Sequence, residues 1–119
     1  MALMPRPEGG PGKLPVPVTA LVRASLGEFS AVVLDCSPLG IELLSPRRLA
    51  DNERVGMTLK CAAVLGPGVS IHGDVQTCRE DAASQYFIRI VFEPSGDAEK
   101  RLQSFLWEME EAGRKRRHR

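Results

Sequence analysis

The sequence predicts a mainly β protein, a six-stranded antiparallel barrel with one C-terminal α-helix. Six short segments alternate apolar and polar residues or are rich in β-branched residues, and turn residues separate them about every ten positions. After residue 92 the apolar residues repeat at helical spacing instead. Short strands followed by one amphipathic helix are typical of a small barrel with a helix packed on it.

The first three strands follow from alternation and from turn residues. Apolar residues at every second position predict a strand over 16–22, and Pro15 and Pro17 place its start at a sheet edge because proline donates no ladder hydrogen bond. A turn at 26–28 leads into a second strand over 28–34, and a third strand begins at 41–44.

The second half of the chain predicts three more strands and the helix. A period of two predicts strands over 55–61 and 69–78, joined by the turn at 66–68, and an almost wholly apolar strand over 86–92. Asp97 is the expected N-cap of the helix and Gly113 the expected C-cap. Trp107 lies off the apolar stripe of this helix. It is therefore expected either at an exposed interface or folded over the barrel rim.

Charge and composition divide the chain into three parts. Residues 1–12 are a flexible leader rich in Gly and Pro, residues 13–112 are the barrel with its helix, and residues 113–119 are a basic tail. Five of the 16 Lys and Arg residues follow Gly113, whereas all 15 Asp and Glu residues precede it. The tail, Arg114 to Arg119, is expected to be a disordered solvated segment, a contact for nucleic acid, anionic lipid or an acidic partner, or a source of cations for a bound ligand.

Several functional classes find no support in the sequence. Cys36, Cys61 and Cys78 are scattered and only two histidines are present, so no metal site or other cofactor is expected. Ser37, His72 and Asp35 form no recognisable nucleophile arrangement and no phosphate-binding loop is present, so an enzyme is not expected. The N-terminus lacks the pattern of a signal peptide and no apolar run has the length of a membrane span, so we expect a cytoplasmic protein.

The most specific motif is Asp35-Cys36-Ser37-Pro38-Leu39-Gly40, which separates the second and third strands. Such a hexapeptide can be simply a hairpin turn closed by its own side chains. Its pattern D-x-S-x-x-G, early in a small β-rich domain, also resembles the second signature of the PilZ family of bacterial domains. The apolar ending Ile90-Val91-Phe92 of the last strand resembles that family too. The resemblance implies a six-stranded barrel with a C-terminal helix. It also implies that Asp35 and Ser37 receive the guanine edges of cyclic di-GMP and that Gly40 keeps the start of the strand clear so that a base can approach.

The same resemblance implies that the other half of the ligand site is the motif R-x-x-x-R, directly before the first strand. Its two arginines should stand at Gly9 and Lys13, so this motif is degraded, and Arg6 lies three positions too early. Lysine cannot form the bidentate hydrogen bonds with a phosphate, or the stacking contact with a base, that arginine forms. Lys13 and Arg6 remain the expected phosphate ligands, and Arg23 and Arg89 are expected either to compensate or to be solvent-facing strand residues.

Two functions follow from the resemblance. The first is a single-domain cyclic di-GMP receptor or adaptor in bacterial signalling that acts by binding a partner protein. The alternative is an adaptor on the same fold that does not bind cyclic di-GMP and serves as an interaction module in pilus or motility machinery. A third, weaker hypothesis is a nucleic-acid-associated protein acting through its basic tail, whose binding would depend steeply on salt.

Overall fold

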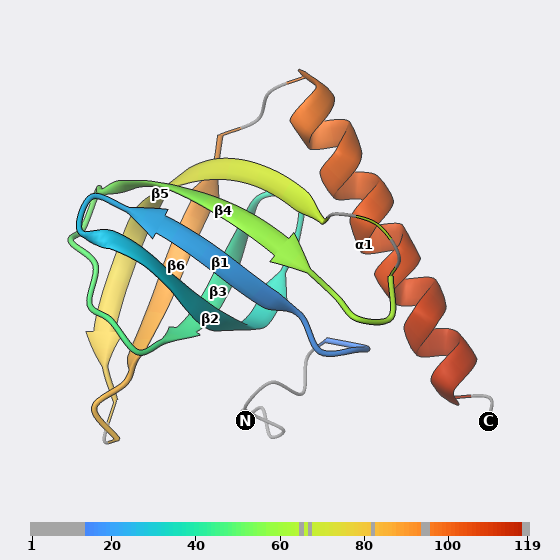
Figure 1. The fold of residues 1–119 in the computed structure, drawn as a ribbon, viewed down its shortest axis with the longest axis horizontal. Coiled ribbons are helices and arrows are strands. Elements are labelled where there is room, and N and C mark those ends of the chain that lie inside the picture. The colour runs from blue at the N-terminus through green and yellow to red at the C-terminus, as the bar shows by residue number, and fades with distance from the viewer. Residues whose placement is uncertain (1–13, 65, 67, 82, 94–95, 118–119) are drawn as a thin grey trace, which may run out of the picture.

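The computed structural model describes residues 14–64, 66, 68–81, 83–93 and 96–117. These residues form six strands and one helix: β1 (Thr19–Ala24), β2 (Gly27–Cys36), β3 (Gly40–Ser45), β4 (Arg54–Lys60), β5 (Val69–Glu80), β6 (Tyr86–Phe92) and α1 (Gly96–Arg117). Neighbouring strands are antiparallel and close a barrel in the order β1-β2-β3-β6-β5-β4 (Figure 1). The predicted six-stranded barrel with one C-terminal helix is confirmed.

Alternation along each strand places apolar side chains inside the barrel. In β6, for example, Ile88, Ile90 and Phe92 are buried, whereas Arg89 and Val91 between them are exposed. This is the period-two pattern of a strand with one face toward a core and the other toward water. The largest fully buried side chains come from all six strands and from the helix: Val22, Val33, Leu43, Ser45, Val55, Met57, Leu59, Val75, Ile88, Ile90 and Leu102.

The first strand begins later than the alternation of valines indicates. Val16 and Val18 are buried in the core, but β1 starts only at Thr19. Pro15 and Pro17 have no backbone N–H and cannot donate to a ladder. One hydrogen bond to β2 is nevertheless formed just before β1, where Val33 N donates to Val18 O at 3.0 Å. The valines of the segment before β1 are therefore buried like those of a strand, although the segment is not part of β1.

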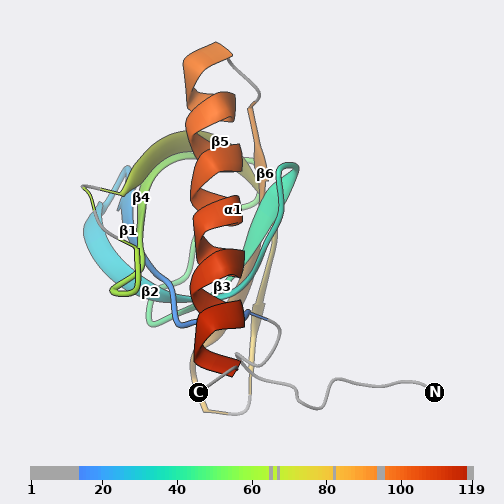
Figure 2. The same ribbon diagram turned by 90° about the vertical axis from the view of Figure 1, so that its right-hand side faces the viewer.

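Helix α1 crosses one open end of the barrel (Figures 1 and 2). Its buried residues Leu102, Phe105 and Met109 recur at spacings of three and four, which aligns them on one face of the helix. Burial of each such side chain contributes roughly 1.5–3 kcal/mol relative to exposure. The helix thus covers the core where the barrel itself leaves it open.

Both predicted helix ends differ from the structure. The helix begins at Gly96, so Asp97 lies inside the first turn, where its negative charge favours the helix dipole. At the other end, α1 continues through Gly113 to Arg117. Gly113 is buried, and a Cβ there would stand 2.2 Å from Cβ of Pro15. Because Gly113 has no side chain, the segment before β1 can pack closely against α1 at this position. Gly113 therefore serves this contact and does not end the helix.

Glu53, in the connection from β3 to β4, joins three parts of the barrel wall. Its carboxylate accepts hydrogen bonds from Ser25 N at 3.0 Å, Ser25 Oγ at 2.8 Å and Ala50 N at 3.2 Å. The two hydrogen bonds from Ser25 are the main cause that lowers the pKa of Glu53; burial opposes them, and the bond from Ala50 adds to the lowering. Glu53 O also accepts from Val75 N at 2.9 Å, which ties this connection to β5.

Candidate functional site

A β-bulge turns Asp35 to the outer face of the barrel. Val33 pairs with Leu43, and both are buried, but the next pair on β2 and β3 joins Asp35 to Glu42. Leu34 is the extra residue, since no residue of β3 stands opposite it. Strict alternation from Val33 would point Asp35 into the core. The bulge instead places its carboxylate outside, beside Glu42.

A second bulge lies on β5, two strands away from β3. Val75 pairs with Ile90 of β6, Thr77 pairs with Arg89, and Gln76 between them has no partner in this register. The connection from β3 to β4 stabilises this bulge, because Asn52 N donates a hydrogen bond to Val75 O at 2.7 Å. The two bulged strands flank β3 and β6, and the outer faces of these four strands form the candidate site.

The side chains of Asp35 and Ser37 shape the turn between β2 and β3. Asp35 Oδ1 accepts from Cys36 N at 3.0 Å, and Ser37 Oγ accepts from Leu39 N at 3.2 Å. Ser37 N donates to Gly40 O at 3.0 Å and closes the turn. The expectation of a side-chain-closed hairpin turn is therefore met. A carboxylate has several acceptor positions and a hydroxyl can still donate, so these bonds leave capacity for a ligand.

Gly40 is required by the close approach of β3 to β6. A Cβ at this position would stand 2.5 Å from the carbonyl oxygen of Ile90, a contact that real Cβ atoms essentially never make. The turn is also bound to β6 by Phe92 N, which donates to Leu39 O at 3.0 Å. Gly40 thus allows the turn to pack against β6. The expectation that it also leaves room for a base of the ligand stays a prediction.

A hollow of about 660 Å³ opens over this turn. Its walls come from the turn, β3, β6, the β5 bulge and the N-terminal part of α1. The lining residues are Asp35, Ser37, Pro38, Leu39, Gly40, Ile41, Glu42, Gln76, Arg89, Ile90, Val91, Phe92 and Glu99. Three of them are carboxylates and one is an arginine. The described part of the wall is therefore negatively charged.

Arg89 is the arginine of the hollow, and it is already paired. It stands opposite Glu42 in the register of β3 and β6, and its Nη2 forms an ion pair with Glu42 Oε2. Arg23, the other arginine considered from the sequence, is elsewhere: it lies in β1 and its Nη1 donates to Thr58 Oγ1 at 3.0 Å. The structure brings Arg89 to the site and leaves Arg23 away from it.

Cys36 lies between Asp35 and Ser37 but faces inward, where it packs against the core. Burial, with a smaller contribution from the negative charge of Asp35, raises the pKa of its thiol to about 12. The thiolate is the reactive form of cysteine, so this side chain stays protonated and inert at neutral pH. It fills space under the turn and contributes no chemistry to the hollow.

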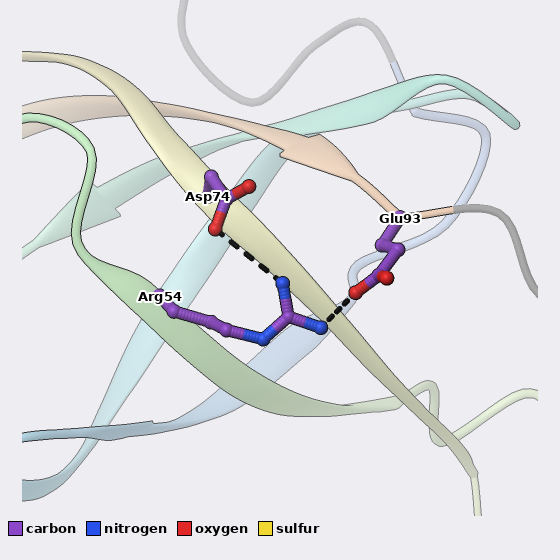
Figure 3. A network of polar contacts seen from close by, with 3 residues as sticks. All are labelled: Arg54, Asp74 and Glu93. Carbon is purple, nitrogen blue, oxygen red and sulfur yellow. Dashed lines mark hydrogen bonds and ion pairs between the residues drawn. The ribbon is translucent and has the colours of Figure 1, made fainter.

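An ion-pair network lies next to the site on the barrel surface (Figure 3). Arg54 of β4 contacts Asp74 of β5 at 3.6 Å and also Glu93, which follows β6. Asp74 is the register partner of Val91, a residue of the hollow. All three charged side chains are more than half exposed, so the network adds little stability. It links β4, β5 and the end of β6 beside the hollow.

The remaining predicted site residues are not placed. Arg6, Gly9 and Lys13 lie outside the described residues, as do residues 118 and 119 of the basic tail. Within the described part of the tail, Arg114 belongs to α1 and pairs with Glu111 at 2.5 Å.

The sequence analysis missed Glu42, Gln76 and Glu99 as lining residues. Alternation in the third strand puts Glu42 outside, but nothing local assigns Gln76 or Glu99 to the same hollow.

Within the residues that the structure describes, no three His, Cys, Asp or Glu side chains gather as they would around a metal ion. The helix of the described chain is not apolar enough over its length to cross a membrane.

Comparison with known proteins decides the family. A family model of the PilZ domain matches residues 5–107. The chain belongs to the PilZ domain family. Its fold is similar to a solved structure described as the PilZ domain with c-di-GMP of YcgR from Escherichia coli, with a TM-score of 0.67. That similarity covers 87% of this chain and 88% of the other at 14% sequence identity. No curated protein matches the chain.

Proposed function

We propose that this PilZ domain is a cyclic di-GMP receptor in bacterial signalling and that it acts by binding a partner protein rather than by catalysis. One observation carries the proposal: the bulge at Leu34 turns Asp35 outward, into a hollow that Ser37 and Gly40 also line. Without the bulge the carboxylate would face the core. A fold similar to the PilZ domain of YcgR, which was solved with c-di-GMP, supports the choice of ligand.

Complementary hydrogen bonding supports the roles of the two polar side chains. Guanine presents N1–H and N2–H donors on one edge, and a carboxylate accepts both at once. Asp35 would receive this edge, and the hydroxyl of Ser37 would donate to an acceptor of the same base. The two phosphates need cations, which the described wall offers only as the paired Arg89. Lys13 and Arg6 would supply them from the segment before β1.

The receptor function also requires that ligand change the affinity for the partner. A ligand shifts an equilibrium only when it binds two states unequally. In this proposal the leader, residues 1–12, orders over the hollow when cyclic di-GMP binds, and the surface so formed alters partner binding. The division into leader, barrel with helix and basic tail, and a cytoplasmic location, are parts of the same proposal.

A second candidate function has an observation of its own. The carboxylates of Asp35, Glu42 and Glu99 outnumber the cation of Arg89 in the hollow. Such a wall opposes a dianionic ligand. Together with Gly9 and Lys13 in place of arginines, this favours an adaptor on the PilZ fold that binds its partner without cyclic di-GMP.

An asparagine substitution separates the two candidates. Asp35→Asn keeps an oxygen for the bond from Cys36 N but loses the second acceptor for guanine. We expect calorimetric titration to show affinity for cyclic di-GMP at least tenfold weaker in Asp35→Asn, about 1.4 kcal/mol or more. Asp51→Asn, an exposed aspartate outside the hollow, is the matched control and should bind as wild type. Equal binding by Asp35→Asn and Asp51→Asn, or no binding by wild type, would favour the adaptor.

A further inference from the structure

A second hollow lies between α1 and the connection from β4 to β5. Its volume is about 730 Å³, and the buried side chains of Cys61, Val69 and Phe105 form its apolar floor. Residues of both α1 and this connection line the hollow. The two hollows share no lining residue among those that the structure describes. The surface is therefore distinct from the site of Asp35.

The rim of this hollow is positively charged. Lys60 stands at the end of β4, and Lys100 and Arg101 stand on α1; all three are exposed. Within the described parts of the chain, none of the three forms an ion pair. One carboxylate, that of Glu108, lines the same hollow. An apolar floor inside a cationic rim fits an anionic occupant that also carries apolar groups.

The surface continues along α1 to an exposed aromatic side chain. Lys100, Ser104 and Glu108 line both this hollow and a neighbouring one of about 530 Å³, and Trp107 lines the neighbouring hollow. Trp107 is 65% exposed, which resolves the two expectations for this residue in favour of exposure. Tryptophan is enriched among the residues that contribute most to binding at protein–protein interfaces.

We propose that this surface, formed by the two joined hollows and Trp107, binds an acidic amphipathic segment of a partner protein. Apolar side chains of the segment enter the hollow over Phe105, its carboxylates meet Lys60, Lys100 and Arg101, and Trp107 packs against its far end. The positively charged rim favours a partner segment with negative charge. The inference rests on the proposed function for the existence of a partner, but it uses different residues from those that would bind cyclic di-GMP.

Selection from a displayed peptide library tests the proposal. A displayed library of random peptides is depleted on the variant K100E/R101E and then selected on the wild-type protein. Trp107 is the single tryptophan of the chain, so its fluorescence reports directly on this surface. We expect the selected peptides to be acidic with spaced aliphatic or aromatic residues, and to shift Trp107 emission to shorter wavelength on binding.

Variants then identify the surface. K100E/R101E and Trp107→Ala should each weaken binding of a selected peptide at least tenfold. The matched reversal R48E/R79E, at exposed arginines outside the hollows, should leave binding within about twofold. Raised salt should weaken binding, because the contact is electrostatic at its rim.

Several outcomes would overturn the proposal. They are enrichment of neutral or basic peptides, no enrichment, an unshifted Trp107 emission, or equal losses in K100E/R101E and R48E/R79E. If decanoate shifts the emission whereas peptides do not, the hollow belongs to a small amphipathic anion instead. Titration of wild type and of K100E/R101E with cyclic di-GMP separates this inference from the proposed function. K100E/R101E should bind the nucleotide as wild type does. Wild-type protein that binds the nucleotide but enriches no acidic peptide contradicts the inference alone.

Discussion

Glu42 of β3 and Arg89 of β6 stand opposite each other and form an ion pair in the hollow that Asp35 lines. The pair matters because Arg89 is the one cation among the described lining residues. Its charge is shared with a carboxylate, so the hollow offers little positive potential to a phosphate. The ion pair therefore opposes the binding that Asp35 would favour.

Neutralising Glu42 should strengthen binding of cyclic di-GMP. In Glu42→Gln, Arg89 loses its carboxylate partner and the hollow loses one negative charge, so we expect an affinity about three- to tenfold higher by calorimetry. Stability should change by less than about 0.5 kcal/mol, because both side chains of the pair are partly exposed to water. Glu28→Gln, at an exposed position of β2 outside the hollow, is the control. Unchanged or weaker binding by Glu42→Gln would contradict this account of the electrostatics.

Restoring arginines before β1 is the complementary test. Lys13→Arg combined with Gly9→Arg should tighten binding of cyclic di-GMP at least tenfold, because each charge-assisted bond to a phosphate contributes roughly 1.5–3 kcal/mol. Lys115→Arg, in the basic end of α1, provides a lysine-to-arginine change away from the hollow. If the double variant binds no better than Lys115→Arg, the segment before β1 does not hold the phosphates.

Gly40→Ala should destabilise the fold. The new Cβ would collide with the carbonyl oxygen of Ile90, so the turn must move away from β6. We expect a loss of about 1–3 kcal/mol in the free energy of unfolding, measured with urea. Leu39→Ala changes the preceding, 80% exposed side chain and should cost less than about 0.5 kcal/mol. Equal costs for the two variants would refute the close approach as the reason for glycine.

Glu53→Gln should lower stability at neutral pH and have little effect in acid. The amide offers one acceptor oxygen where the carboxylate serves Ser25 and Ala50 with two, so we expect a loss of about 1 kcal/mol. Because folding lowers the pKa of Glu53, its charged form stabilises the protein above its ordinary pKa. That contribution disappears as the pH falls through the lowered value.

Thermal unfolding of Glu53→Gln and wild type, compared at neutral pH and near pH 3, measures this difference. The two midpoints should converge as the pH falls through the lowered pKa of Glu53, because the wild-type carboxyl then becomes neutral as well. Glu110→Gln, on an exposed part of α1, should show the wild-type profile at both values. A gap between Glu53→Gln and wild type that persists in acid would assign the effect to packing rather than to charge.

The fold could be predicted from the sequence because period and turn residues are local signals. The last strand was predicted over 86–92 and is found there, since its apolar run ends at turn residues on both sides. Helix α1 was predicted to end at Gly113, and it does not. A buried glycine that contacts Pro15 has the same local pattern as a C-cap, and only the tertiary contact distinguishes them.

The site could be predicted only in part. Asp35, Ser37 and Gly40 stand together in the sequence, and the hollow contains all three. The bulge at Leu34 is invisible to periodicity, because an extra residue changes the pairing of two strands and not the composition of either. Glu99 is 64 positions beyond Asp35 in the numbering, and no local signal places it in the same wall.

The most direct test of the central claim is a calorimetric titration of cyclic di-GMP into the wild-type protein at low and moderate salt. The receptor account predicts micromolar or tighter binding that weakens as salt rises, since cations must hold two phosphates against a wall containing Asp35, Glu42 and Glu99. Absence of heat with ligand near a millimolar would contradict it. The turn would then be a structural feature of the barrel, and partner binding without nucleotide would be the remaining function.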